Sequence, residues 1–503
     1  MAGKTRVLLI GIDSASPELI FKWLDELPNI RRLIDRGAGG YLESTIPPLS
    51  APAWTSLVTG KNPGKTGVYD WIRLTKNGCV KINYLAAVKE PKIWDLLGQA
   101  KLKSCVVNVP LSYPPFKLNG IMVSGIPAHI TGGHITYPKS LKGELDKIVN
   151  GYEVYPYVDL RIPGKESEYL NEFKRVLEKR VKATLYLLEN KPWDFFMIVF
   201  FVLDSIQHYF WKHMDKTHPQ HDPELSKIYG NVIKMFYIKM DKIIGKLISV
   251  AGRNTNVIVV SDHGMGPLYG QLLINNLLLK LGMICLKGEI KNHLVSKEIS
   301  KSLIYESLLA IIRTMNKLSR FKGGDLLTKI LPFHLKERFT LRGELKLKFE
   351  QLINIIDFKE TKALAIGESG GIFIINEAAR NIVKNVLEAI LRRLGCEGYI
   401  YEKDEIYKGY RIDEIPDILY VMKGYKVETG LIPGLRLWQP STLSGYHTRY
   451  GIIIMSGPKI IPLKDTIRQP LRCKIYDVMP TVLKLFGLRV PPNVDGKPLE
   501  CIS

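Results

Sequence analysis

The sequence predicts an α/β fold in which helices cover both faces of a parallel central sheet. Three observations support this prediction. Short apolar, β-branched segments recur along the chain, segments with helical spacing of apolar residues separate them, and hydrophobic residues make up 46% of 503 residues. Strands that are apolar on both faces are typical of parallel sheets, because helices bury each face. Alternation of such strands with helices is the pattern of α/β proteins.

The predicted elements follow from these patterns in chain order. Four early strands are expected at Arg6–Ile12, Ser104–Val109, Asp194–Val202 and Asn256–Ser261. Amphipathic helices are expected at 166–188 and 223–250, where each leads into the next strand. Later strands are expected at Gly370–Asn376, Asp417–Met422 and Tyr450–Pro458.

The stretch from Lys287 to Glu350 has a different composition, rich in lysine and leucine with a helical pattern. We therefore expect a catalytic core in two parts, residues 1–285 and 361–503, interrupted by a basic helical insertion at 286–360. Three interpretations of the insertion stay open: a cap over an active site, a helix on a membrane surface, or a decorated face of the protein.

Composition limits the classes of protein that remain possible. No apolar stretch approaches the roughly 20 residues that span a bilayer, and the apolar run near the N-terminus is too short for a signal peptide, so we expect a cytoplasmic protein. The six cysteines form no C-x-x-C pair, which argues against a disulfide framework or a thiolate zinc site. The formal charge of +22 could attract nucleic acid, anionic lipid or a small phosphorylated substrate, but a uniformly basic surface explains it equally well. The oligomeric state leaves no signal in the sequence.

Acidic and histidine residues gather where the predicted strands end. Asp13 follows the first strand, Asp204 the third, and Asp262 and His263 the fourth. Because the carboxyl ends of strands in open α/β sheets border one crevice, these side chains can meet there although they are distant in sequence. Mixed carboxylate and imidazole groups predict divalent metal ions, with zinc favoured and manganese or iron as alternatives.

The spacing divides these residues into two ligand sets. Asp204 and His208 are four residues apart, so a helix turns both to one face, and His447 in SGYHTRYG would complete a set of three ligands with an open position. Asp13, Asp262 and His263 form the second set. Two ions roughly 4 Å apart can stabilise the attacking and leaving oxygens of a displacement at phosphorus. Each residue alone would be weak evidence, since an aspartate after a strand is commonly a turn former.

The segment from Thr45 to Trp71 contains two candidate features. G-K-N-P-G-K-T at 60–66 is one residue shorter than a P-loop, and no apolar strand precedes it. Ser50, by contrast, precedes a predicted helix with Pro52 in its first turn. A serine at this N-cap lies beside free N–H groups that favour phosphate, so we predict that Ser50 is the nucleophile, with simple helix capping as the alternative.

The ordered motifs resemble the alkaline phosphatase superfamily, specifically its type I phosphodiesterase and nucleotide pyrophosphatase branch. The motifs are LLIGIDSASPELI, PPLSAPAWTSLVTGKNPGKTGVYDW, VLDSIQHYFW, VVSDHGMG and SGYHTRYG. The resemblance implies an alkaline-phosphatase-like three-layer α/β/α sandwich. It also implies one metal held by Asp204, His208 and His447, and a second metal held by Asp13, Ser50, Asp262 and His263.

The resemblance further implies a two-metal phosphoric ester hydrolase, specifically a phosphodiesterase or nucleotide-pyrophosphatase-like enzyme, that acts through a covalent phospho-serine on a small phosphorylated substrate. A phosphomonoesterase, phosphomutase or phospho-headgroup transferase would use the same metals, and a non-catalytic binder of nucleic acid or anionic membrane is the alternative from another class. Where nucleotide pyrophosphatases carry a phosphate-contacting asparagine, this chain has GVYDW with Asp70 and Trp71. Trp71 and Lys65 are predicted substrate contacts, with core packing and a solvated surface as the respective alternatives.

Overall fold

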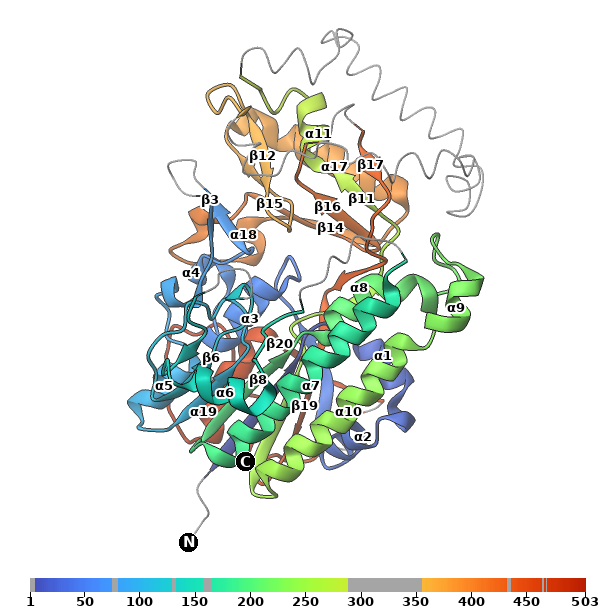
Figure 1. Ribbon diagram of the computed structural model, residues 1–503. Coiled ribbons are helices and arrows are strands. Elements are labelled where there is room, and N and C mark those ends of the chain that lie inside the picture. Colours follow the sequence, from blue (N-terminus) through green and yellow to red (C-terminus); the bar gives the residue numbers. More distant parts are fainter. Residues whose placement is uncertain are drawn as a thin grey trace.

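Figure 1 shows the computed structural model, which describes residues 5–74, 80–128, 133–156, 164–287, 355–431, 436–463, 466 and 468–503. Most of the predicted insertion lies outside these residues, so its predicted role stays a prediction. The predicted core boundaries at 285 and 361 stay predictions.

A nine-stranded sheet forms the centre of the larger part of the molecule. In spatial order its strands are β20 (Leu471–Lys474), β2 (Gly37–Glu43), β19 (Tyr450–Ser456), β9 (Thr255–Val260), β1 (Arg6–Ile12), β8 (Phe195–Phe200), β5 (Ser104–Val107), β6 (Gly120–Val123) and β7 (Thr136–Tyr137). β9, β1, β8, β5 and β6 are parallel, whereas β19 is antiparallel to both of its neighbours and β7 is antiparallel to β6. The predicted sheet is confirmed as mostly parallel.

Helices cover both faces of this sheet, as the alternating side chains of β1 show. Leu8, Ile10 and Ile12 pack into one apolar cluster, and Val7 and Leu9 pack into another on the opposite face. The first cluster is covered by α1 (Pro17–Lys22), α2 (Pro28–Asp35), α7 (Glu166–Asn190), α8 (Val202–Met214) and α10 (Val232–Ala251). The second is covered by α3 (Ser50–Thr59), α5 (Ile93–Gln99) and α19 (Val478–Leu485). The three-layer α/β/α architecture is therefore confirmed.

A smaller unit lies beyond the carboxyl ends of the parallel strands, at the top of Figure 1. Its four-stranded antiparallel sheet has the order β12 (Ala363–Ile366), β13 (Gly371–Ile374), β15 (Ile418–Met422) and β14 (Gly398–Glu402). A second sheet consists of β16 (Tyr425–Glu428), β11 (Gly270–Leu273) and β17 (Trp438–Gln439), and α11 (Ile274–Lys280) and α17 (Arg380–Leu394) pack beside them. This unit has an apolar core of its own.

One sequence prediction is confirmed and another needs correction. The segments predicted as strands near 370 and 417 are strands, and the structure places them in the smaller antiparallel sheet. The helix predicted at 223–250 is divided into α9 (Pro223–Tyr229) and α10, with Gly230 and Asn231 between them. Among the described helices, none is long and apolar enough to cross a bilayer.

Candidate active site

The carboxyl ends of three adjacent strands carry the candidate acids. β1 lies between β8 and β9, with Ile12 opposite Phe200 and Gly11 opposite Val260. Asp13 follows β1, Asp262 follows β9, and Asp204 lies in the first turn of α8, directly after β8. The sheet topology therefore places these carboxylates beside one another, as the strand-end argument predicts.

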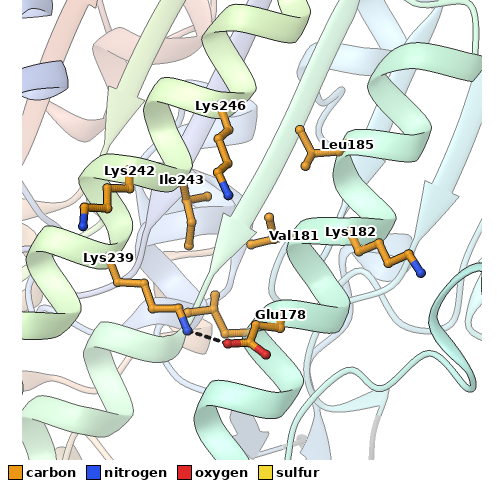
Figure 2. Close-up of a pocket in the computed structure, with 9 residues that line it drawn as sticks. Glu178, Val181, Lys182, Leu185, Lys239, Lys242, Ile243 and Lys246 are labelled. Atoms are coloured by element: carbon orange, nitrogen blue, oxygen red, sulfur yellow. Dashed lines mark hydrogen bonds and ion pairs between the residues drawn. The ribbon is translucent and has the colours of Figure 1, made fainter.

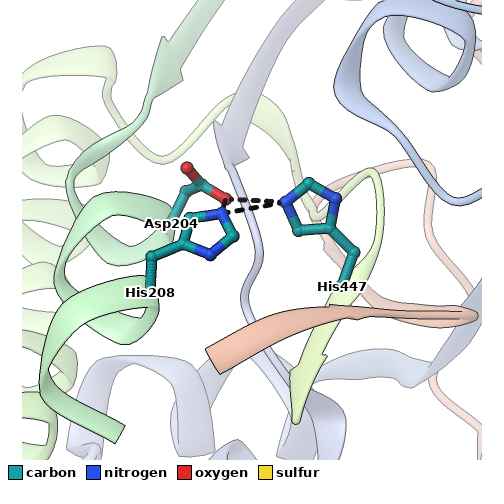
Figure 3. A group of neighbouring side chains, drawn as sticks. All are labelled: Asp204, His208 and His447. Carbon is teal, nitrogen blue, oxygen red and sulfur yellow. Dashed lines mark hydrogen bonds and ion pairs between the residues drawn. The ribbon is translucent and has the colours of Figure 1, made fainter. Parts of the chain in front are cut away.

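The first ligand group consists of Asp204, His208 and His447, which Figure 3 shows turned toward a common point. Nε2 of His208 lies 3.3 Å from Oδ1 of Asp204 and 3.1 Å from Nε2 of His447, and the latter atom is also 3.3 Å from Oδ1 of Asp204. Asp204 and His208 share one face of α8, so the spacing of four residues has the predicted effect.

His447 reaches this group from a separate two-stranded antiparallel sheet. It lies on β18 (Gly445–Thr448), which pairs with β10 (Gly264–Pro267) in the register that sets His447 opposite Met265. Gly445 passes so close to α8 that a Cβ there would meet the carbonyl oxygen of Gln207 at 2.5 Å. This close approach lets the carbonyl of Gly445 accept a hydrogen bond of 2.7 Å from Nδ1 of His208.

The second ligand group consists of Asp13, Asp262 and His263, all fully buried. Nε2 of His263 lies 3.2 Å from Oδ2 of Asp262 and 3.8 Å from Oδ1 of Asp13. Burial, reinforced by Asp262 and Asp204, raises the pKa of Asp13 well above its usual range. Burial and Asp204 likewise raise the pKa of Asp262, and burial and His447 lower the pKa of His263. The pocket thus disfavours the ionised carboxylates, and among the described residues no lysine or arginine pairs with Asp13 or Asp262.

Both groups have the donor chemistry that a divalent cation requires. His208 donates through Nδ1 to a carbonyl, so Nε2 of the neutral ring presents a lone pair to Asp204 and His447. Oδ2 of Asp262 is buried and, among the described residues, has no hydrogen-bond partner. Acceptor atoms that converge at about 3 Å repel one another unless a proton or a cation lies between them. Oxygen and imidazole ligands in threes fit zinc, manganese or iron.

Ser50 lies against the second group. Its Oγ is 3.1 Å from Nε2 of His263 and 3.3 Å from Oδ1 of Asp13. Ser50 is the first residue of α3 and not its N-cap, which is Leu49, and its side chain makes no capping bond. This corrects the predicted position by one residue. The hydroxyl is therefore directed at the ligand group, at the start of a ten-residue helix whose first N–H groups favour anions.

Sequence reasoning missed two residues that hold this arrangement. Nε1 of the buried Trp54 donates a hydrogen bond of 2.9 Å to Oδ2 of Asp13, which leaves Oδ1 facing Ser50. The Ser50 to Trp54 spacing of four residues was the available signal, because it sets both on one face of α3. Ser14 is the other: its hydroxyl lies within hydrogen-bonding distance of Asp204 and of His263. Its position directly after Asp13 was the only hint.

The other predicted contacts have partners elsewhere. Lys65 is bonded to the carbonyl of Asn493 at 2.8 Å and to Asp495 at 2.5 Å, so the structure does not bring its ammonium to the ligand groups. Trp71 is partly buried and packs against the cluster on the α3 face of the sheet. Whether either residue contacts a substrate stays a prediction.

Asp70 lies in the stretch after α3 where the resemblance leads us to expect an asparagine, and its carboxylate contacts the smaller unit. Its Oδ2 accepts 2.7 Å from the backbone N–H of Ser369, and its Oδ1 accepts 2.6 Å from that of Trp71. Burial raises the pKa of this carboxyl to about 6. The Asp70 carboxyl therefore links the two units by accepting a backbone amide on each oxygen.

A partly exposed charged pair from the smaller unit lies next to the first group. Lys426 on β16 contacts Glu368 at 3.2 Å and lies 5.3 Å above the ring of Tyr446, which stacks on His447 with centroids 4.8 Å apart. Although burial acts to raise it, the pKa of Glu368 is lowered by Lys426, His447 and His208. No sequence signal pointed to this pair.

The comparison with known families decides the assignment. The profile of the type I phosphodiesterase / nucleotide pyrophosphatase family matches residues 7–430. The chain belongs to this family. The matched range includes every proposed ligand except His447, which the fold brings in from beyond it. Membership in this family supports a phosphoric ester hydrolase, and the two groups of side chains described above are candidate metal ligands.

Solved structures agree on the fold. Two structures of murine ectonucleotide pyrophosphatase/phosphodiesterase 5 superimpose with TM-scores of 0.54 and 0.53 at 13% sequence identity, covering 99% of this chain and 100% of each of those chains. The first of the two is an inactive form in complex with AMP. No curated protein matches the chain.

Proposed function

We propose that the protein is a two-metal phosphodiesterase that transfers the phosphoryl group to Ser50 and then to water. One observation carries this proposal: the Ser50 hydroxyl lies within 3.3 Å of two members of one ligand group, while the other group adjoins it through His263 and His447, whose ring centroids are 4.0 Å apart. Asp204, His208 and His447 would hold one cation, and Asp13, Ser50, Asp262 and His263 the other. When bound, such cations favour the ionised hydroxyl, neutralise phosphoryl oxygens and activate water.

The residues of the chain then have distinct tasks in the displacement. Oγ of Ser50, having lost its proton, attacks phosphorus, and the P–O bond to the departing alcohol breaks, the released oxygen taking up a proton. The phosphoryl group on Ser50 keeps the second alcohol of the diester. N–H groups of the first turn of α3 stabilise the added negative charge. Water then breaks the Ser50 phosphoester and restores the hydroxyl. Trp54 holds Asp13 in place throughout.

Exposure sets the direction from which the substrate arrives. The second group is fully buried, whereas the side chain of Asp204 is 22% exposed and Ser50 retains 7%. The departing alcohol therefore leaves on the side of the first group, past Glu368 and Lys426. Because the structure of one structural relative contains AMP, a diester of a nucleotide is the first substrate to test.

The test is a substrate panel measured with the metal-loaded protein. Turnover of aryl phosphodiesters or of a dinucleotide, faster than that of aryl phosphomonoesters and of a sulfate ester, is expected. Turnover confined to monoesters would replace the diester proposal with the phosphomonoesterase alternative. The mutase and transferase alternatives predict phosphoryl transfer to an added alcohol in place of water.

A second candidate function, attachment to an anionic membrane surface, is favoured by a groove between α7 and α10. The groove encloses about 500 Å³, its floor includes Leu177, Val181, Leu185 and Ile243, and four lysines border it. Figure 2 shows Lys239 and Lys246 pointing between the two helices, with Glu178 paired to Lys239 at 2.8 Å. Within the described part of the chain, Lys182, Lys242 and Lys246 have no ion pair. An apolar floor with a cationic border suits acyl chains below lipid phosphates.

Reversal of charge in this groove should abolish vesicle binding. We expect the triple variant Lys182→Glu, Lys242→Glu, Lys246→Glu to lose co-sedimentation with vesicles containing phosphatidylserine, since each lysine near such a surface contributes about 1 kcal/mol. A matched triple variant at Lys101, Lys103 and Lys117, which are exposed and do not line this groove, should bind like the unaltered protein. Equal losses in both variants would show diffuse charge attraction and refute the groove as a docking site.

A further inference from the structure

Ser14 keeps a side chain in a conformation that favours glycine. It follows Asp13 at the end of β1, is fully buried, and has a φ of 61°. Residues other than glycine are uncommon in this left-handed region, and those found there are concentrated at functional sites. The serine hydroxyl therefore needs a reason to be retained at this position.

The hydroxyl of Ser14 contacts both ligand groups at once. It donates a hydrogen bond of 2.7 Å to Oδ1 of Asp204, in the first group. The same oxygen lies 3.2 Å from Nδ1 of His263, in the second group. A carboxylate only accepts, so the single hydroxyl proton is directed to Asp204 and the oxygen lone pairs are left for His263.

This contact determines which nitrogen of His263 can bind a cation. With the Ser14 oxygen accepting at Nδ1, the ring carries its proton there, and the carbonyl of Gly264 at 3.1 Å supports the same tautomer. Nε2 is then unprotonated, and this is the nitrogen that faces Ser50 and Asp262. Partners of this kind orient a histidine ligand and raise its affinity for metal.

The backbone around Ser14 is held independently of its hydroxyl. Nε2 of Gln207 donates to the carbonyl of Ser14 at 2.8 Å, the N–H of Ala15 donates to Oγ of Ser261 at 2.8 Å, and the N–H of Ser16 donates to the hydroxyl of Tyr237 at 2.9 Å. Removal of the hydroxyl should therefore leave the loop in place. The effect of a substitution can then be attributed to the lost contacts with Asp204 and His263.

We propose that Ser14 is a positioning residue that couples the two metal sites, because its one hydroxyl orients a ligand of each. This inference rests on the two-metal site proposed above. Loss of the hydroxyl releases Asp204 and His263 together, so it weakens both sites, whereas a residue that served only one group would affect one site.

The test is a titration of metal-free protein with Zn²⁺ against a chromophoric chelator, without substrate. Ser14→Ala removes the hydroxyl and keeps the backbone strain, while Ser14→Gly removes both. We expect both variants to lose about 10- to 100-fold in affinity at each of two sites, as lost partners of ligands typically cause. Agreement between them excludes strain as the cause. Ser16→Ala is the matched control, because Ser16 is equally buried but its hydroxyl bonds to Glu18.

The possible outcomes separate the two proposals. Unchanged affinity at both sites, or a loss at only one site, overturns the coupling role of Ser14 and leaves the two-metal hydrolase intact. Failure of the unaltered protein to bind two ions overturns both. Urea unfolding of the metal-free proteins is the folding control. A midpoint for Ser14→Ala equal to that of the unaltered protein shows that the measured affinities compare folded chains.

Discussion

Ser50→Ala should abolish turnover while the protein keeps its fold and its capacity for two cations. In the proposed mechanism Oγ of Ser50 attacks phosphorus, and this atom lies beside both Nε2 of His263 and Oδ1 of Asp13. We expect kcat to fall by at least about 10³-fold, which corresponds to about 4 kcal/mol of lost transition-state stabilisation. The measurement is steady-state turnover of the best diester in the panel.

Ser50→Thr provides the matched variant, since it retains a hydroxyl on the same turn of α3. It should keep measurable turnover. A quench of the unaltered protein with acid during turnover should trap on Ser50 the phosphoryl group with the retained alcohol of the diester, detectable by peptide mass. Turnover by Ser50→Ala within threefold of the unaltered protein would remove Ser50 from the reaction and leave the metals with a water nucleophile.

His447→Ala should remove one of the two cations and nearly all activity. This ring would supply one of three ligands of the first group. Its side chain is only 6% exposed, so water does not easily take its place as a ligand. We expect metal content to fall from two ions to one per chain and kcat/KM to fall at least about 10³-fold. Elemental analysis of dialysed protein, together with turnover, is the measurement.

The same variant tests the contribution of metal to stability. A ligand at about 1,000 times its Kd stabilises the folded state by about 4 kcal/mol, so chelation should lower the Tm of the unaltered protein more than that of His447→Ala. His221→Ala is the control, because His221 bonds to the carbonyl of Lys212 and belongs to neither group. Retention of two ions by His447→Ala would contradict the assigned first group.

The sequence could predict that the candidate ligands meet, because their positions follow from topology. Asp13, Asp204 and Asp262 each come directly after an apolar strand, and neighbouring parallel strands deliver such residues to one edge. His208 was predictable from its helical spacing to Asp204. Ser50 was predictable as a residue at the start of a helix. The prediction placed it at the N-cap, whereas it is the first helical residue, and a difference of one residue is common at helix ends.

Other features depend on contacts that no local pattern encodes. The strands near 370 and 417 have the same apolar pattern as the central strands, but they pair with each other and form part of the smaller sheet. Glu368 and Lys426 reach the site only because that unit packs over it. Ser14 was missed because one serine after an aspartate is ordinary in sequence, and only its positive φ and its two contacts make it unusual.

Anomalous diffraction from crystals grown with Zn²⁺, collected on both sides of the zinc edge, tests the central claim most directly. The account predicts two peaks: one bounded by Asp204, His208 and His447, and the other by Asp13, Asp262, His263 and Oγ of Ser50. Peaks at other places, or a single peak remote from Ser50, would contradict it.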